Sequence, residues 1–145
     1  NFELSFYFYY RKQTGLNAFA SSSPPGEIYN IPEEVYQNHW QQPGDIVKYA
    51  KFTTNSGVDP SYTNFYFYSD GKFTDASFIR LQNLSLSYSF PEKLINKDKI
   101  KNCRLYIKGE NLLLITKYKG SDPEIQNFGA IPISKIITAG FSCNF

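Results

Sequence analysis

Residues with the chemistry to catalyse a reaction or to bind a metal are scarce in this chain of 145 residues. It contains one histidine, His39, and two cysteines, Cys103 and Cys143. These three residues are too few for a zinc site built from cysteine and histidine. There is no G-x-S-x-G nucleophile elbow and no glycine-rich phosphate loop. We therefore expect no enzyme activity, no cofactor and no metal site, and we interpret His39 as a surface histidine.

The composition argues against two further classes of protein. The net charge is +2 and only 19% of the residues are charged, which is too balanced for binding nucleic acid by neutralising phosphates. Aromatic residues make up 18%, yet the mean hydropathy is −0.41, because they are interleaved with polar residues. No stretch approaches the roughly 20 apolar residues of a membrane helix. The chain lacks Met and starts at Asn1, so we expect a piece of a longer protein.

Alternation of polar and apolar residues with a period of two predicts β-strands with two different faces. In residues 83–90, for example, Leu84, Leu86 and Tyr88 share one face and serines lie on the other. The pattern predicts long antiparallel strands near 1–11, 72–90, 102–115 and 132–145. Ordinary strands have about five or six residues, whereas a strand that crosses a bilayer needs about nine to eleven. A water-soluble antiparallel sheet with one wet face would show the same alternation, so both interpretations stay open.

The connections between these strands are unequal in length. Residues 91–99 form a short charged turn, while the loops 12–71 and 116–131 are longer. In the first of these loops, Pro32 followed by two glutamates predicts a short helix. Asp70-Gly71 predicts a hairpin turn. Long loops at one edge and short turns at the other are typical of outer-membrane barrels.

The last eight residues contain the most specific local pattern, a polar-x-Gly-x-x-apolar-x-apolar sequence that ends on an aromatic residue. Its positions are Thr138, Gly140, Cys143 and Phe145. The pattern resembles the signal by which the barrel assembly machinery recognises outer-membrane proteins. An apolar row that ends in an aromatic residue suits the membrane interface.

The two cysteines belong to the last two predicted strands, near the ends that antiparallel pairing brings together. We expect their Cα atoms to lie roughly 4.5–7 Å apart. A disulfide is possible in an oxidising compartment. Directly paired strand positions often have poor disulfide geometry, however, and cysteine also serves as a small apolar residue.

Three further motifs extend the resemblance to nearly the whole chain. Residues 75–91 contain the strand Ser77-Phe78-Ile79-Arg80-Leu81-Gln82-Asn83, residues 105–112 end in Gly109-Glu110-Asn111-Leu112, and residues 118–124 contain "G-x-DPE". Together they resemble the C-terminal part of a TonB-dependent outer-membrane transporter of the SusC/RagA type, found in Bacteroidetes. Glu110 stands where glutamine is frequent in that family, and Ser87 stands where glycine is common.

The resemblance implies an all-β fold in which this chain supplies the last strands of a large transmembrane β-barrel, here an open curved sheet with long extracellular loops. It further implies location in the cell outer membrane and import of oligosaccharides or peptides. The implied partners are a SusD-like lipoprotein lid, TonB acting through a missing N-terminal part, and outer-membrane lipid. The piece alone would not transport.

Aromatic residues of the loops are the best candidates for contacts with a ligand or with the lid, because aromatic faces stack on sugars and peptide side chains. The candidates are Tyr29, Trp40, Tyr62 and Tyr66, with Tyr36 and Tyr68 beside them. Their alternative role is to pack a small core within the loop. Arg104, Lys108 and Glu110 would face the lumen. Asp122 and Glu124 could suggest calcium but are more often a solvated turn.

A second class of protein stays open. The chain could be a secreted β-sandwich that binds glycans, with aromatic loops as the platform. Such a sandwich would bury Leu84, Leu86, Phe141 and Phe145 against a second sheet, whereas a barrel would leave this row facing lipid.

Overall fold

The computed structural model describes residues 1–20, 23–27, 30–54, 62, 64, 66, 68–91, 93 and 102–144. Its elements run in the order β1 (Phe2–Arg11), β2 (Thr14–Leu16), α1 (Glu33–Gln37), a 3-10 turn η1 (Asp70–Lys72), β3 (Phe73–Asp75), β4 (Phe78–Ser89), β5 (Asn102–Thr116) and β6 (Ile136–Asn144). The chain divides into two compact units, residues 1–13 with 76–145, and residues 14–75. In the part of the chain that the structure describes, no helix is long and apolar enough to cross a membrane.

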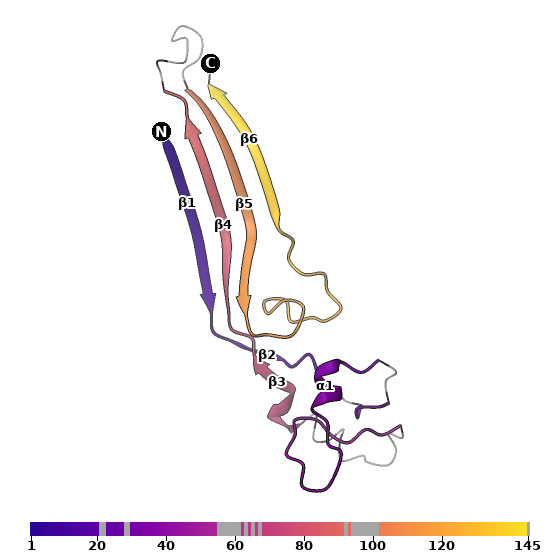
Figure 1. Cartoon of the computed structure of the whole chain (residues 1–145). Coiled ribbons are helices and arrows are strands. Elements are labelled where there is room, and N and C mark those ends of the chain that lie inside the picture. The colour runs from indigo at the N-terminus through magenta and orange to yellow at the C-terminus, as the bar shows by residue number, and fades with distance from the viewer. Residues whose placement is uncertain are drawn as a thin grey trace. The chain divides into compact units, whose positions relative to one another are not determined.

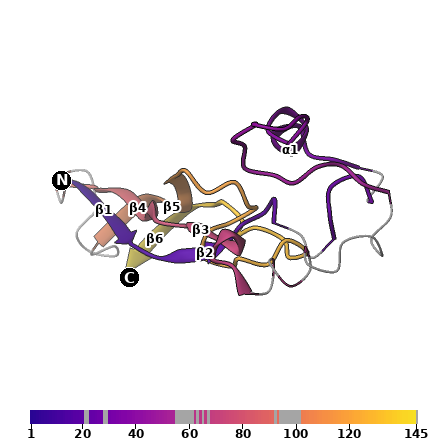
Figure 2. The same ribbon diagram turned by 90° about the horizontal axis from the view of Figure 1, so that it is seen from below.

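The first unit is a four-stranded antiparallel sheet in the order β1-β4-β5-β6 (Figure 1). Figure 2 looks nearly along these strands, which follow a twisted and curved surface rather than a flat one. The predicted all-β antiparallel meander is therefore confirmed. Both outer strands, β1 and β6, have one neighbour each within this sheet.

One face of this sheet is apolar across all four strands. The register pairs Leu4 with Leu86, Leu86 with Ile107, and Ile107 with Ala139, and direct partners share a face. The same face carries Phe2, Phe6, Phe8, Ile79, Leu81, Leu84, Leu105, Leu113, Ile115, Ile137 and Phe141, besides Tyr10 and Tyr88. Leu86 is 43% exposed and Phe141 is 62% exposed. A sandwich core would bury both side chains, so the apolar face does not fit the glycan-binding sandwich.

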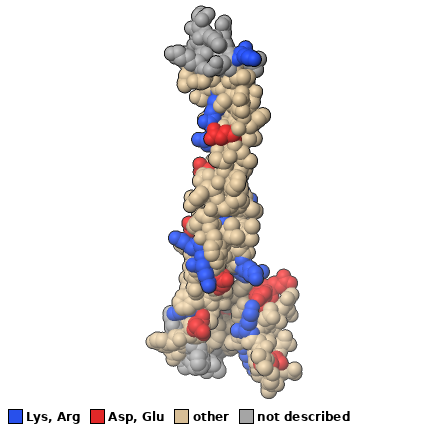
Figure 3. All heavy atoms as spheres, turned by 90° about the vertical axis from the view of Figure 1, so that its left-hand side faces the viewer, with Lys and Arg blue, Asp and Glu red and all other residues tan. Residues whose placement is uncertain are grey.

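The opposite face is polar. The register pairs Glu3 of β1 with Ser87 of β4, and Arg104 of β5 pairs with Ser89 on the same face. From there Arg104 Nη2 donates diagonally to Glu3 Oε2 at 2.8 Å and to Ser87 Oγ. Ser5 and Ser85 form a hydrogen bond at 2.8 Å two residues further along β1. Figure 3 views the sheet from the side of β1, and there the charged atoms of the long sheet gather toward one side while the rest is largely uncharged.

A bulge keeps the two faces distinct along the full length of β4. Tyr7 pairs with Asn83 but Phe8 pairs with Leu81, so Gln82 is an extra residue in β4. The pairing of β4 with β5 shifts at the same level, where Asn111 has a left-handed φ of 54°. Strict alternation from Leu84 would carry Arg80 to the apolar face. Because Gln82 is extra, Arg80 lies on the polar face instead.

The strand predicted over 72–90 is divided in the structure. β3 pairs with β2 in a separate two-stranded sheet, and β4 begins only at Phe78. Between them Ala76 is fully buried and its N–H donates to Gln13 O at 3.0 Å. Gln13 N–H donates to Ser77 Oγ. These contacts fix the chain where it passes from one sheet to the other.

Two other predicted boundaries differ from the structure. The hairpin predicted at Asp70-Gly71 is wrong, because these residues form η1 after Ser69, whose Oγ accepts the Gly71 N–H at 3.0 Å. The last strand begins at Ile136 rather than near 132, and Pro132, which has no N–H to donate to a neighbouring strand, precedes it. The short helix predicted after Pro32 is present as α1, with Glu33 and Glu34 in its first turn.

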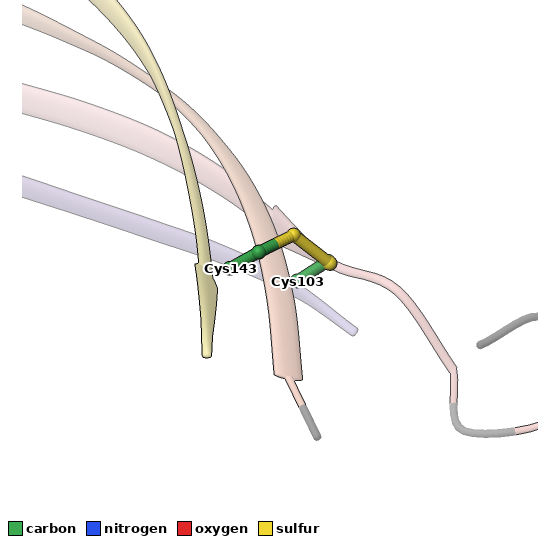
Figure 4. Close-up of a disulfide and its surroundings, with 2 residues drawn as sticks. All are labelled: Cys103 and Cys143. Atoms are coloured by element: carbon green, nitrogen blue, oxygen red, sulfur yellow. A yellow bond between two sulfur atoms is a disulfide. The ribbon is translucent and has the colours of Figure 1, made fainter. Parts of the chain in front are cut away.

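The two cysteines are direct partners of β5 and β6 and form a disulfide (Figure 4). Their Cα atoms lie 4.3 Å apart, slightly closer than the predicted range. The predicted proximity is therefore confirmed. The disulfide is present although the sequence favoured two unbonded cysteines, because directly paired strand positions often have poor disulfide geometry. The bridge ties the end of β6 to the start of β5.

Candidate functional site

Trp40 lines an open cavity of about 490 Å³ within the unit formed by residues 14–75. Its walls are Tyr36, Gln37, His39, Trp40, Gln41, Lys51 and Phe52. The His39 ring stacks on Phe52 with centroids 3.8 Å apart, and Tyr36 lies 5.9 Å from His39. Lys51 Nζ lies 5.6 Å from the centroid of the Trp40 ring. His39 is thus half-buried in an aromatic stack rather than a plain surface histidine.

Local backbone contacts hold Trp40 in place. Its N–H donates to Tyr49 O at 3.0 Å, and the Tyr49 N–H donates to Asn38 O. In the turn after Trp40, the Asp45 carboxylate accepts the N–H groups of Gln42 and Gln41, and these hydrogen bonds hold the pKa of Asp45 below its usual range. The indole is therefore presented from a defined turn.

Tyr62 and Tyr66 line a second cavity of about 330 Å³ in the same unit, together with Phe19, Tyr49 and Lys72. Burial raises the pKa of the Tyr62 and Tyr49 phenols. Both hydroxyls therefore keep their protons at neutral pH and can donate hydrogen bonds. The structure brings Tyr62 and Tyr66 to one cavity and places Trp40 in the other. Tyr29 lies outside the described residues.

Four residues form the predicted assembly signal, and the structure describes three of them. Thr138 and Gly140 lie on the polar face, opposite Lys108 and Tyr106 of β5. Cys143 lies on the apolar face in the disulfide. Phe145 lies outside the described residues. Their role in recognition stays a prediction.

The polar face has one end covered by the segment that joins β5 to β6. Asp122, which the sequence suggested as a solvated turn residue, is buried and pairs with Arg80 of β4. Glu124 Oε1 accepts a hydrogen bond from Tyr9 of β1 at 2.7 Å. The three charged residues predicted to face the lumen, Arg104, Lys108 and Glu110, lie on this same polar face through their register.

The sequence is similar to known receptors over most of its length, although no family profile matches it. It is 29% identical to TonB-dependent receptor P3 of Formosa agariphila, over 92% of this chain and 15% of that receptor. It is 33% identical to TonB-dependent receptor P39 of the same bacterium, over 70% of this chain and 9% of that receptor. Among solved structures, it superposes on the RagAB peptide importer in the "open-open" state with a TM-score of 0.70 and 26% identity, over 99% of this chain and 16% of that one.

The chain resembles the TonB-dependent receptors, and its matches agree with a segment of a receptor of the SusC/RagA type. It spans 15% and 13% of the length of the first two receptors that it matches. The four-stranded sheet of this receptor segment corresponds to part of the RagA barrel, which agrees with an open sheet whose outer strands each have one neighbour.

Sequence reasoning missed the contact between Arg80 and Asp122 in this receptor segment. Both residues belong to motifs that carried the resemblance, the strand of residues 77–83 and the "G-x-DPE" loop. A lone arginine in an apolar strand signals a buried partner, because a charge is costly in an apolar environment without one. The sequence contains 13 acidic residues and does not single out Asp122 among them.

Proposed function

We propose that this receptor segment forms four neighbouring wall strands of an outer-membrane transporter that imports oligosaccharides or peptides with a SusD-like lipoprotein as its lid. The apolar face of the sheet carries the proposal. In a barrel this face would contact lipid, and the polar face would line a wet lumen.

The open edges of the sheet support the same reading. An unpaired strand edge in lipid leaves backbone groups without hydrogen bonds, at several kcal/mol each. Further strands of a complete receptor would pair with β1 and β6 and close the wall. TonB would act through the part of the receptor that lies outside this chain. The barrel assembly machinery would insert the complete receptor into the outer membrane.

The unit formed by residues 14–75 would lie on the extracellular side, where the Trp40 cavity could contact ligand or lid. Its aromatic walls suit a sugar ring or an apolar peptide side chain, and the amides of Gln37 and Gln41 could bind hydroxyl or peptide groups.

The test uses the complete gene in its host. Deletion should abolish TonB-dependent growth on one of two sources, casein peptides or plant oligosaccharides, while growth on glucose stays normal. The protein should appear in outer membranes as a heat-modifiable band. Normal growth of the deletion strain on every oligosaccharide and peptide source, or a protein absent from outer membranes, would contradict the proposal.

A matched pair of variants tests the Trp40 cavity in that strain. Trp40→Ala removes the indole and should raise the half-saturating concentration for uptake several-fold, since a stacked aromatic contact contributes about 1 kcal/mol. Tyr68→Ala is the control, because Tyr68 is highly exposed and lines neither cavity. Equal effects of the two substitutions would exclude a specific role for Trp40.

A further inference from the structure

The most deeply buried charges of the four-stranded unit lie where the segment between β5 and β6 meets the polar face. The side chains of Arg80 and Asp122 are each 3% exposed. Arg80 Nη2 lies 2.9 Å from both carboxylate oxygens of Asp122, and its Nε lies 3.4 Å from Glu124 Oε2. Tyr9 donates to the other oxygen of Glu124. Side chains of β1 and β4 thus hold one turn of this segment.

The turn is also fixed by its own hydrogen bonds. Asp122 Oδ1 accepts the Glu124 N–H at 2.9 Å, and Asp122 O accepts the Gln126 N–H at 3.0 Å. Pro123 is fully buried, and its carbonyl accepts a hydrogen bond from the Gln13 amide. The carboxylate of Asp122 therefore serves the arginine and the turn at once.

The start of the segment is attached to the sheet as well. Thr116 Oγ1 donates to Ser77 O at 2.8 Å and accepts the Tyr118 N–H at 3.0 Å. Tyr118 is buried. Figure 1 shows the segment between β5 and β6 coiled beside the end of the sheet rather than extended along the strand direction.

An ion pair this deep needs a reason other than stability. Apolar residues of similar volume often replace a buried ion pair at no cost in stability, whereas removing one partner costs about 3–5 kcal/mol. The ion pair can instead restrict the turn to a single position on the polar face. Arg80 contacts two carboxylates of one turn, so the turn has one place to lie on the polar face.

We propose that residues 117–126 form a fixed internal constriction of the transport path, and that Arg80 is the positioning residue that holds it. This inference rests on the proposed function, in which the polar face lines the lumen. A segment clamped to that face narrows the lumen permanently, unlike a lid that opens with each cycle. Solutes that pass the wall at this point would meet the turn containing Asp122 and Glu124.

The test measures thiol accessibility in the complete receptor on intact cells. Both cysteines of this segment are bonded, so Ser121→Cys supplies a free thiol beside Asp122, and the receptor without this substitution gives the background labelling. We expect a small charged methanethiosulfonate to label this exposed position, and a maleimide on a long polyethylene glycol chain to react at least about tenfold more slowly, because the clamped segment leaves the bulky reagent too narrow a path through the lumen. Equal rates for the two reagents would overturn the inference without any further variant.

Substitutions of Arg80 then test the positioning role. Arg80→Met should bring the rate of the bulky reagent up to that of the small one, and Arg80→Lys should keep it slow, since lysine still supplies a cation for Asp122. Arg104→Met is the matched control, because it removes an exposed ion pair on the same face without touching the segment. A bulky rate that stays slow in Arg80→Met, or rises as much in Arg104→Met, would overturn the role of Arg80.

Two further measurements distinguish failure of the constriction from failure of the proposed function and from failure of a variant to assemble. Heat modifiability reports whether each variant assembles, and Asp122→Asn, which removes the same ion pair at constant size, replaces Arg80→Met if that variant does not assemble. Ile46→Cys marks the unit formed by residues 14–75, where Ile46 is fully exposed. Labelling of Ile46→Cys by both reagents together with equal labelling at Ser121→Cys overturns only the constriction. No labelling of Ile46→Cys by either reagent overturns the proposed function and the constriction with it.

Discussion

At the scale of single residues, Gly140 belongs to the predicted assembly signal and also packs against a neighbouring aromatic ring. The sequence pattern assigns it to the assembly signal. In the structure it is the direct partner of Tyr106, and a Cβ at position 140 would overlap the tyrosine ring. An aromatic ring that lies across a partner glycine shields the backbone that the glycine exposes.

We predict that Gly140→Val destabilises the complete receptor by about 1–3 kcal/mol, because the valine displaces the Tyr106 ring. The measurement is the temperature at which the folded band disappears on a heat-modifiability gel. Ala139→Val is the control, since Ala139 lies on the apolar face. Gly140→Val combined with Tyr106→Ala should recover most of the loss. If the double variant is no better than Gly140→Val, the cost comes from the assembly signal and not from packing.

At the scale of the element, the bulge at Gln82 determines which side chains of β4 lie on the apolar face. A slip of one residue moves every side chain of a strand to the other face. Without the extra residue, either Arg80 moves to the apolar face or the pairing beyond Asn83 is lost. Both alternatives break the buried contact with Asp122.

We therefore predict that deletion of Gln82 abolishes assembly of the complete receptor. The expected cost combines about 2–4 kcal/mol for a charge on the lipid face with about 3–5 kcal/mol for breaking a buried ion pair. The substitution Gln82→Ala keeps the chain length and should assemble normally, because the Gln82 side chain is exposed. The amount of heat-modifiable band in outer membranes is the measurement. Normal assembly of the deletion variant would show that the register is not fixed at this bulge.

The disulfide links β5 to β6 and should stabilise the pairing of these two strands. Its two cysteines are 40 residues apart in sequence, and closing a loop of that length removes up to about 4 kcal/mol of chain entropy from the unfolded state. We predict that Cys103→Ser with Cys143→Ser lowers the unfolding temperature of the complete receptor, and that reduction of the wild type has the same effect. The double variant should not respond to the reductant. A wild type that is equally stable before and after reduction would contradict this role.

At the scale of the whole molecule, the separation into an apolar and a polar face should decide whether the receptor inserts. Ile107→Lys places a charge on the apolar face and should cost about 2–4 kcal/mol near the bilayer centre. Asn83→Lys is the control, because Asn83 lies on the polar face opposite Glu110. We expect less folded receptor in outer membranes for the first variant only. Equal yields for the two would show that the apolar face does not contact lipid.

Much of this architecture could be predicted from sequence, because the alternation of polar and apolar residues along each strand can be recognised directly in the sequence. The alternation in residues 83–90 and the position of the cysteines determined the faces and the pairing of β5 with β6. The bulge at Gln82 and the division between β3 and β4 could not be predicted, since each depends on partners far away in sequence such as Tyr7 and Gln13. The contact between Arg80 and Asp122 joins residues 42 apart for the same reason.

The disulfide also turns part of the chain into a covalent ring. The segment clamped by Arg80 and all but the outermost residues of β5 and β6 lie between Cys103 and Cys143. A protease that cuts the segment between β5 and β6 would open this ring at one point and would release nothing, because the two strands would stay joined through sulfur. A nicked receptor would therefore run as one species on a gel without reductant and as two with it, and β5 and β6 would stay linked after a cut between them.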